Sequence, residues 1–378
     1  MIPYGRQEIT EKDIEAVVDV LRSDFLTQGP VVPTFEKKLC NYTGVKYAVA
    51  VNSCTSALHI ACLSLDLGHG DILWTSPITF VASANCALYC GATVDFVDVE
   101  PDTALMSVKR LKEKLEWAEK EGKLPKIVVP VHFAGQPCDM KEIHDLGRQY
   151  GFKIIEDAAH AIGAKYQDES VGNCRYSDIT VFSFHPVKII TTGEGGCALT
   201  NNKHLARKMT LYRSHGITRD SKEMIHASPE GWYYEQICLG FNYRMSDIQA
   251  SLGISQLERL DQYVKRRFEI ANWYDEKINL DILHPLARRN NRKSSHHLYV
   301  VQSKNKTERD TLYQHLIESD VYVNLHYIPV YHHPHYNINI NLPGAEQYFR
   351  TAISLPIFPT IEKKDLIYIM KNILEVCL

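Results

Sequence analysis

The stretch Asp178–Gly196, which reads DITVFSFHPVKIITTGEGG, decides how this chain folds. Its first part, Asp178–Phe184, is rich in β-branched and aromatic residues, which favours a buried strand. Pro186 ends that strand because proline has no N–H group to continue the hydrogen-bond ladder. Lys188 follows in a glycine-rich loop just past the strand, where α/β sheets place their reactive groups. Partial desolvation there lowers the pKa of an amine and makes it a nucleophile toward carbonyl compounds.

A second strand, upstream of this one, ends in two carboxylates. The segment Lys153–Ala159 reads KIIEDAA and carries Asp157 at the carboxyl end of an apolar run. A sheet can bring Asp157 beside Lys188, and this is a pair that pyridoxal phosphate (PLP) requires. The amine binds the aldehyde of PLP, and the carboxylate keeps its ring nitrogen protonated. The alternative, that Asp157 only caps a following helix, fits the sequence equally well.

Small polar residues follow a third apolar run. Lys46–Val51 predicts a strand, Asn52–Ser56 reads NSCTS, and Ala57–Leu65 predicts a buried helix. The free N–H groups and dipole of a helix N-terminus attract phosphate, and the hydroxyls of Thr55 and Ser56 add donors. The same residues can also serve as helix caps alone. The sequence has no Walker or dinucleotide glycine pattern, so nothing in this turn indicates a nucleotide phosphate.

The composition is that of an ordinary globular protein. The chain has 378 residues, 45% of them hydrophobic and 23% charged, which predicts two domains or one large one. Its net charge of −3 gives no reason to expect a nucleic-acid partner. The ten cysteines are scattered without a C-x-x-C pair, which favours free thiols in a reducing compartment. Without a signal segment or a membrane-length apolar run, we expect a cytoplasmic protein that has no membrane contact.

These motifs stand in an order that resembles a known family. Further matching motifs run the length of the chain: YGRQ at 4–7, FLTQGP at 25–30, NSCTSAL at 52–58, GFNYRMSD at 240–247 and SLP at 354–356. With EDAAH at 156–160 and FSFHPVK at 182–188, they resemble the DegT/DnrJ/EryC1/StrS type of sugar aminotransferase, a family of fold-type I PLP enzymes.

The resemblance implies an α/β fold in two parts. A large, mostly parallel sheet domain flanked by helices would cover residues 1–246, and a small C-terminal α+β domain residues 247–378. Within the family the chain most resembles the pseudaminic-acid branch, which moves an amino group from L-glutamate to C4 of a UDP-linked 4-keto-6-deoxy-N-acetyl hexosamine. The alternatives are aminotransfer to a GDP- or dTDP-linked keto sugar, as in perosamine-type synthesis, and a non-catalytic PLP-binding regulatory protein. A related dehydratase has histidine in place of the lysine, so Lys188 argues against dehydration.

The resemblance also assigns roles to single residues. Lys188 is the catalytic residue, which holds PLP and moves a proton during transamination. The residues matched to the cofactor are Thr55, Ser56, Phe80, Asp157, His160, Ser183 and Asn242. In this match Phe80 stacks over the pyridine ring. Asn242 matches the position that reaches the phosphate held by the other subunit, which implies a homodimer with shared sites.

Four further residues are candidates for contact with the substrate. His185 is close to Lys188 in sequence, although it can equally cap the loop, and His326 resembles a family position near the substrate. His215 and Arg219 lie in a basic, glycine-containing loop that suits a pyrophosphate, or that is merely solvated. We expect no metal site, because the prolines among His332, His333 and His335 disrupt ligand spacing.

Two further patterns predict elements in the C-terminal third. A capping box at Ser246–Gln249 predicts one long helix from there to about Ile278. The run Val321–Leu325 predicts a strand of the small domain.

Overall fold

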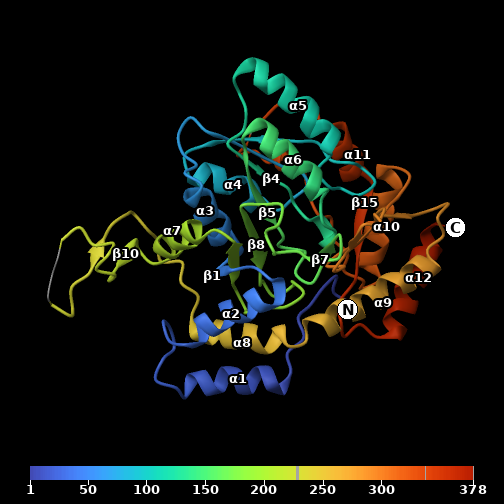
Figure 1. Cartoon of the computed structure of the whole chain (residues 1–378). Helices are drawn as coiled ribbons and strands as arrows, with labels where there is room; N and C mark the ends of the chain where they lie inside the picture. The colour runs from blue at the N-terminus through green and yellow to red at the C-terminus, as the bar shows by residue number, and fades with distance from the viewer. Residues whose placement is uncertain (227–229, 337, 378) are drawn as a thin grey trace.

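The computed structural model describes residues 1–226, 230–336 and 338–377, and its centre is a seven-stranded sheet in the order β1-β9-β8-β5-β4-β2-β3 (Figure 1). Strand β9 runs antiparallel to both its neighbours, and the other neighbouring pairs are parallel. The strands are β1 Tyr47–Val51, β2 Ile72–Thr75, β3 Thr93–Phe96, β4 Ile127–Val129, β5 Lys153–Asp157, β8 Ile179–Ser183 and β9 Gly196–Thr200. The predicted large, mostly parallel sheet is therefore confirmed.

Helices cover both faces of this sheet because its strands are apolar on both sides. Ile155 and Val181 pack against one layer of helices, whereas their neighbours Ile154 and Phe182 pack into the cores on the opposite face. The first layer is α3 Cys54–Ser64, α4 Ala82–Tyr89 and α7 Lys203–Arg213. The opposite layer includes α2 Val31–Thr43, α5 Val108–Glu121, α6 Met140–Tyr150 and α8 Asp247–Leu257, and α1 Glu11–Leu21 packs on α8.

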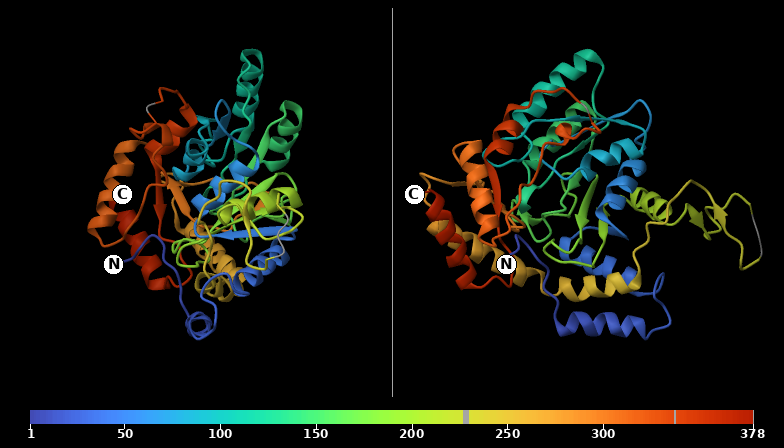
Figure 2. Two further views of the ribbon diagram at one scale, coloured as in Figure 1. Left: turned by 90° about the vertical axis from the view of Figure 1, so that its left-hand side faces the viewer. Right: turned by 180° about the vertical axis from the view of Figure 1, so that it is seen from behind.

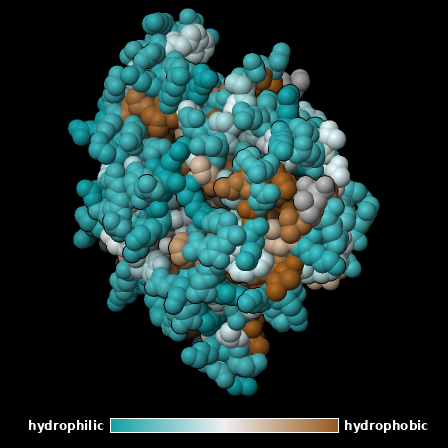
Figure 3. Space-filling model, turned by 90° about the vertical axis from the view of Figure 1, so that its right-hand side faces the viewer, coloured by the Kyte–Doolittle hydropathy of each residue, from teal (hydrophilic) through white to brown (hydrophobic). Residues whose placement is uncertain are grey.

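A smaller α+β region with its own core follows in the C-terminal third. Its elements are α9 Leu260–Lys277, β12 His284–Pro285, β14 Tyr299–Gln302, α10 Lys306–Glu318, α11 Pro343–Thr351, β15 Ala352–Leu355 and α12 Lys363–Cys377. Seen from the right-hand side of Figure 1, the surface is mostly hydrophilic, and its hydrophobic side chains gather in limited patches (Figure 3). Other short elements are η1 Phe133–Gly135, β6 Lys165–Tyr166, β7 Glu169–Ser170, β13 Arg292–Lys293 and η2 Val330–His332. The domain division at residue 246 stays a prediction.

The single long helix predicted up to about Ile278 is wrong, because the structure has two helices there. α8 ends at Leu257 and α9 begins at Leu260. Arg259 leaves the helical conformation at φ −107° and ψ 4°, and its guanidinium binds the buried Asp13 carboxylate at 2.6 and 2.7 Å. This ion pair with α1 holds the chain at the break.

The strand predicted at Val321–Leu325 is also wrong. Val321 makes a single bridge to Ile2, and Asn324 makes a single bridge to Ser354. The segment passes between the N-terminal chain and β15 and pairs with each at one residue only, so no ladder forms.

A hairpin projects from the body beyond α7 (Figures 1 and 2). We call residues 217–226 and 230–240 the arm; it contains β10 Ile217–Thr218 and β11 Glu235–Gln236. Gly216 sits at its base with a φ of +68°, and a Cβ there would lie 1.9 Å from the Cys238 carbonyl oxygen, so only glycine fits. Among the described residues, no helix combines the length and hydropathy that a membrane crossing needs.

Candidate active site

Three strands end at one edge of the sheet and carry most of the predicted cofactor residues. β5 ends at Asp157, the adjacent β8 ends at Ser183, and β1 leads through Asn52 into α3. The loop that holds Lys188 begins after β8 and returns to it, because Phe184 N–H donates to the Gly195 carbonyl at 2.9 Å. The sheet therefore brings Lys188, Asp157, Ser183 and the start of α3 together at the carboxyl ends of its strands.

The amine of Lys188 lies in a desolvated position. Burial lowers the pKa of Lys188 to about 8, although the neighbouring Cys54 and Asp157 favour its charged form. Near neutral pH a much larger fraction of this amine is therefore unprotonated than in an exposed lysine, whose pKa is about 10.4. An unprotonated amine is the form that attacks a carbonyl carbon.

Asp157 is a buried carboxylate held by two donors. Its Oδ2 accepts a hydrogen bond from Ser83 Oγ at 2.6 Å, and its Oδ1 accepts one from Ala159 N–H at 3.0 Å. No helix begins after it, since the next helix in the described chain is α7, which starts at Lys203. The interpretation of Asp157 as a helix cap is therefore wrong. Ser83, on α4, was not predicted from the sequence.

The turn between β1 and α3 has free donors. Ser53 is the N-cap of α3 and accepts from Ser56 N–H at 3.1 Å, while Ser56 Oγ donates to Asn52 Oδ1 at 2.7 Å. In the part of the chain that the structure describes, the hydroxyls of Thr55 and Ser183 have no hydrogen-bond partner. The start of α3 and the end of β8 thus offer a helix N-terminus and two free hydroxyls, which is a suitable environment for a phosphate group.

Three histidines are buried beside this edge of the sheet. Burial and the charge of Lys188 lower the pKa of His160, His297 and His326, in the last case to about 3, so all three are neutral at pH 7. The rings of His160 and His297 are 4.3 Å apart, and His326 Nδ1 lies 2.8 Å from Ser354 Oγ. The Nδ1 atoms of His160 and His297 are buried and have no hydrogen-bond partner among the described residues. They can accept or donate a hydrogen bond without carrying charge.

Tyr327 contacts His160, and Phe80 lies next to Tyr327. Tyr327 Oη lies 3.2 Å from His160 Nε2, and the Tyr327 ring is 6.4 Å from that of Phe80. Phe80 is 60% exposed, which leaves one face of this large side chain free to stack on a flat ligand. Sequence reasoning missed Tyr327 and His297, although both directly follow a histidine in the chain.

The other predicted site residues, namely His185, His215, Arg219 and Asn242, lie farther from the strand ends. His185 is exposed, with its Nε2 4.0 Å from Glu194 Oε1, and its Nδ1 accepts from Val187 N–H at 3.4 Å. His215 lies at the base of the arm, and Arg219 lies on the arm directly after β10, where it stacks over Tyr234. Asn242 is exposed, and its backbone oxygen accepts from Asn52 Nδ2 at 3.5 Å. The structure therefore does not bring Arg219 to the Lys188 of its own chain.

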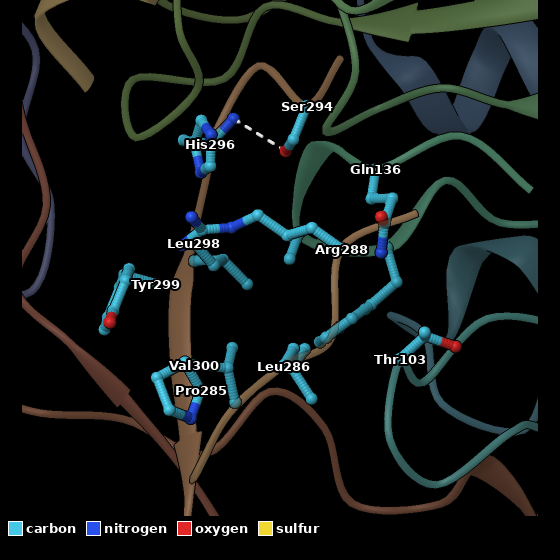
Figure 4. A pocket seen from close by; sticks show the side chains of 12 residues that line it. Thr103, Gln136, Pro285, Leu286, Arg288, Ser294, His296, Leu298, Tyr299 and Val300 are labelled. Atoms are coloured by element: carbon cyan, nitrogen blue, oxygen red, sulfur yellow. Dashed lines mark hydrogen bonds between the residues drawn. The ribbon is translucent and has the colours of Figure 1, made fainter. Parts of the chain in front are cut away.

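Two hollows lie elsewhere in the molecule. One is a cavity of about 30 Å³ bordered by Thr103, Gln136, Leu286 and Arg288 (Figure 4). The other is an open depression of about 650 Å³ between the start of α10 and α11. None of the predicted site residues borders either hollow, so the group around Lys188 is separate from both.

The comparison with protein families identifies the class. The model of the DegT/DnrJ/EryC1/StrS aminotransferase family matches residues 7–374. The chain belongs to this family. The family, the fold class and the assignment as a sugar aminotransferase that were predicted from the sequence are thereby confirmed.

Individual relatives are similar over the whole length of the chain. One is the UDP-4-amino-4,6-dideoxy-N-acetyl-beta-L-altrosamine transaminase of Campylobacter jejuni, 36% identical over 100% of this chain and 97% of that protein. Another is Helicobacter pylori PseC, an aminotransferase of pseudaminic acid biosynthesis, with TM-score 0.91 and 31% identity over 100% of this chain and 99% of that one. The PLP form of a putative sugar aminotransferase from Streptococcus pneumoniae has TM-score 0.88 and 30% identity over 100% and 98% of the chains.

Proposed function

We propose that this protein transfers an amino group from L-glutamate to the C4 ketone of a UDP-linked 4-keto-6-deoxy-N-acetyl hexosamine, with PLP as its cofactor. The single observation that carries the reaction is the desolvated Lys188 amine, whose pKa is lowered to about 8, next to the buried Asp157. The similarity over full length to the Campylobacter jejuni transaminase and to Helicobacter pylori PseC supports the substrate class.

The residues at the strand ends fit PLP. Lys188 Nζ would bind its aldehyde, Asp157 would hold the proton of its ring nitrogen, and the start of α3 would bind its phosphate. Thr55 and Ser183 would contribute their hydroxyls to the phosphate, the His160 Nδ1 would be available to a polar group of the ring, and Phe80 would stack on it. When bound, PLP supplies an electron-withdrawing ring that stabilises negative charge on the substrate carbon.

The protein's own part in the chemistry follows from Lys188. With the cofactor bound, Lys188 Nζ would act as the base at the reacting carbon, and its lowered pKa would allow it to accept a proton and to return it near neutral pH. Asp157 keeps its orientation through the bonds from Ser83 and Ala159. The neutral His326 is a candidate for hydrogen bonding to the sugar without adding charge.

The active unit that we propose is a homodimer. Asn242 is exposed at the base of the arm, and the arm presents large apolar side chains to solvent in the single chain, among them Ile225, Trp232 and Leu239. A second subunit that covers the arm would bring Asn242 to its phosphate site, and His215 and Arg219 toward its substrate. The cytoplasmic location stays a prediction; the free state of the nine described cysteines suits a reducing compartment.

The function is tested by the absorbance of the purified protein with PLP. We expect a band of lysine-bound PLP that L-glutamate removes and that only the UDP-linked 4-keto sugar restores, among UDP-, GDP- and dTDP-linked ketones. Lys188→Ala should lose both the band and turnover, whereas Lys153→Ala, at an exposed lysine paired with Asp178, should keep both. A band that L-glutamate leaves unchanged would contradict the assignment of L-glutamate as the amino donor. Restoration of the band by another nucleotide sugar would contradict the assignment of the UDP-linked ketone as the substrate.

The shared site is tested by mixing two inactive variants. Asn242→Ala alone should retain PLP poorly, and Lys188→Ala alone should be inactive. In a mixed dimer, one site combines Lys188 of one subunit with Asn242 of the other, so re-equilibrated mixtures should recover about a quarter of the intact sites. Mixtures no better than the average of the two variants would show that each subunit works alone.

A further inference from the structure

The loop between β2 and α4 has two neighbouring side chains in different environments. Phe80 is largely exposed, whereas Thr79 is buried, as is Ser83 one turn further along. The Ser83 N–H donates to the Phe80 carbonyl at 3.2 Å, and this turn into α4 places the side chains of Thr79 and Ser83 next to each other. Their hydroxyl oxygens lie 2.7 Å apart. We call Thr79 and Ser83 the hydroxyl pair.

The hydroxyl pair leads to the carboxylate of Asp157. Ser83 Oγ donates to Asp157 Oδ2 at 2.6 Å, and its contact with the Phe80 carbonyl is longer, at 3.3 Å. Thr79, Ser83 and Asp157 are 3%, 1% and 4% exposed. In such a buried position a hydrogen bond is stronger than in water, and successive hydrogen bonds polarise one another. The three side chains therefore form one connected row.

The direction of the protons in this row follows from the available acceptors. An ionised carboxylate can only accept, so the Ser83 proton points to Asp157. If that proton pointed to Thr79 instead, lone pairs of Ser83 and Asp157 would face each other at 2.6 Å. Within the described part of the chain the Thr79 hydroxyl has no hydrogen-bond partner other than Ser83, so it donates to Ser83. Both hydroxyl protons are thus directed toward the carboxylate.

We propose that Thr79 is a positioning residue, which acts through Ser83 to hold the Asp157 carboxylate in place for the ring nitrogen of the cofactor. This inference rests on the proposed function, because it requires PLP at the strand ends. The Ser83 hydroxyl on Oδ2 and the Ala159 N–H on Oδ1 together hold the plane of the carboxylate against rotation. With its own proton on Ser83, Thr79 keeps the Ser83 proton on Oδ2. The ring nitrogen then meets an acceptor that is already oriented.

The same loop connects this carboxylate with the aromatic side chain that would stack on the ring. Thr79 directly precedes Phe80, so the hydroxyl pair ties the backbone at Phe80 to Asp157. The Val330 N–H also donates to the Pro77 carbonyl at 3.0 Å, which anchors the start of the loop. A flat ring would have to contact Phe80 and Asp157 at once, and a fixed relation between two such groups favours binding because less freedom is lost.

The test compares two cofactor analogues that bind without a covalent bond to Lys188. Deoxypyridoxine phosphate lacks the aldehyde but keeps the ring nitrogen, and its carbon analogue has a C–H group in place of that nitrogen. Calorimetry with the cofactor-free protein measures the preference for the first analogue over the second. Thr79→Val removes the hydroxyl at nearly constant shape and should reduce this preference about three- to tenfold, whereas Thr79→Ser should retain it.

A matched control is Thr75→Val. Thr75 is fully buried at the end of β2, and its hydroxyl donates to the Val129 carbonyl at 2.9 Å. This variant should unfold at a lower urea concentration and keep the preference of the parent protein. If Thr79→Val weakened the binding of both analogues equally, its role would be purely structural and the proposal would be overturned.

A second comparison uses Asp157→Asn as the background. Since Thr79 acts only through this carboxylate, Thr79→Val should change the preference no further there. A further loss of the same size would overturn the proposal. A parent protein without a preference would contradict the cofactor role of Asp157 in the proposed function. An unchanged preference in Thr79→Val would instead overturn the role of Thr79 alone.

Discussion

Two neighbouring carboxylates at the end of β5 lie in opposite environments. Because side chains alternate along a strand, Glu156 and Asp157 point to opposite sides of the sheet. Glu156 accepts hydrogen bonds from His132 at 2.7 Å, from Thr180 at 3.0 Å and from Ser177. Burial raises the pKa of Glu156, but these hydrogen bonds lower it below its usual value. On the other side, Asp157 has Ser83 and a backbone N–H as its donors and faces Lys188.

The two histidines beside these carboxylates repeat the contrast. His132 Nε2 lies 2.7 Å from Glu156 Oε2, and its Nδ1 accepts from Cys138 N–H at 3.2 Å, so both nitrogens have partners. His160 Nε2 lies next to the Tyr327 hydroxyl, whereas its Nδ1 has no hydrogen-bond partner in the part of the chain that the structure describes. The first side is a closed network that stabilises the sheet, whereas the second keeps polar atoms available to a ligand. The two sides should therefore respond differently to mutation.

The largest effect should come from opening the closed network. Glu156→Ala leaves His132, Ser177 and Thr180 without their shared acceptor, which costs about 1–3 kcal/mol for each buried group left unsatisfied. Unfolding in urea should show this loss, while kcat of the folded fraction stays near that of the parent protein. A loss of turnover without a loss of stability would contradict the structural role of Glu156.

The matching change at Asp157, on the other side of the sheet, should affect turnover. Asp157→Asn retains the contacts with Ser83 and Ala159 but removes the negative charge, so we expect kcat to fall about 10²–10³-fold. Urea unfolding of the cofactor-free protein should change little. A stability loss comparable to that of Glu156→Ala would show that the two carboxylates have the same role.

The third effect is a shift in pH dependence. The pKa of Lys188 is lowered from 10.5 to about 8, so its neutral, reactive fraction rises through pH 8. The rate at which cofactor-free protein binds PLP covalently should therefore have its midpoint near pH 8 and be about 100-fold higher at that pH than for an ordinary lysine. Borohydride trapping and mass spectrometry at Lys188 measure this rate; a midpoint near pH 10 would contradict the desolvated position.

The smallest effect concerns the hydroxyl that lies next to the His160 ring nitrogen Nε2. Tyr327→Phe removes the hydroxyl at 3.2 Å from His160 Nε2 and should cost about 0.5–1.5 kcal/mol in urea unfolding. Turnover should fall by about tenfold or less. Tyr322→Phe, at an exposed tyrosine, is the control. If both substitutions had equal effects, the bond to His160 would contribute nothing.

The comparison also separates what sequence reasoning can predict from what it cannot. The sequence predicts Lys188 and Asp157 as site residues because strand periodicity, Pro186 and the glycine-rich loop fix where β5 and β8 end. It does not predict Ser83, His297 or Tyr327, since each of these residues reaches the site from another element through tertiary packing. The break between α8 and α9 depends on the ion pair of Arg259 with Asp13, which is 246 residues away in the chain. Local helix patterns in the sequence therefore do not predict the break.

The arm has a consequence for how the protein behaves on dilution. Trp232 and Leu239 are 71% and 78% exposed in the single chain, so the described residues of the arm leave large apolar side chains in solvent. In the proposed homodimer their burial depends on an encounter between subunits, and mass action then makes the stability of the arm depend on protein concentration. Dilution would expose the arm to proteases while the central sheet, which each chain completes alone, stays folded.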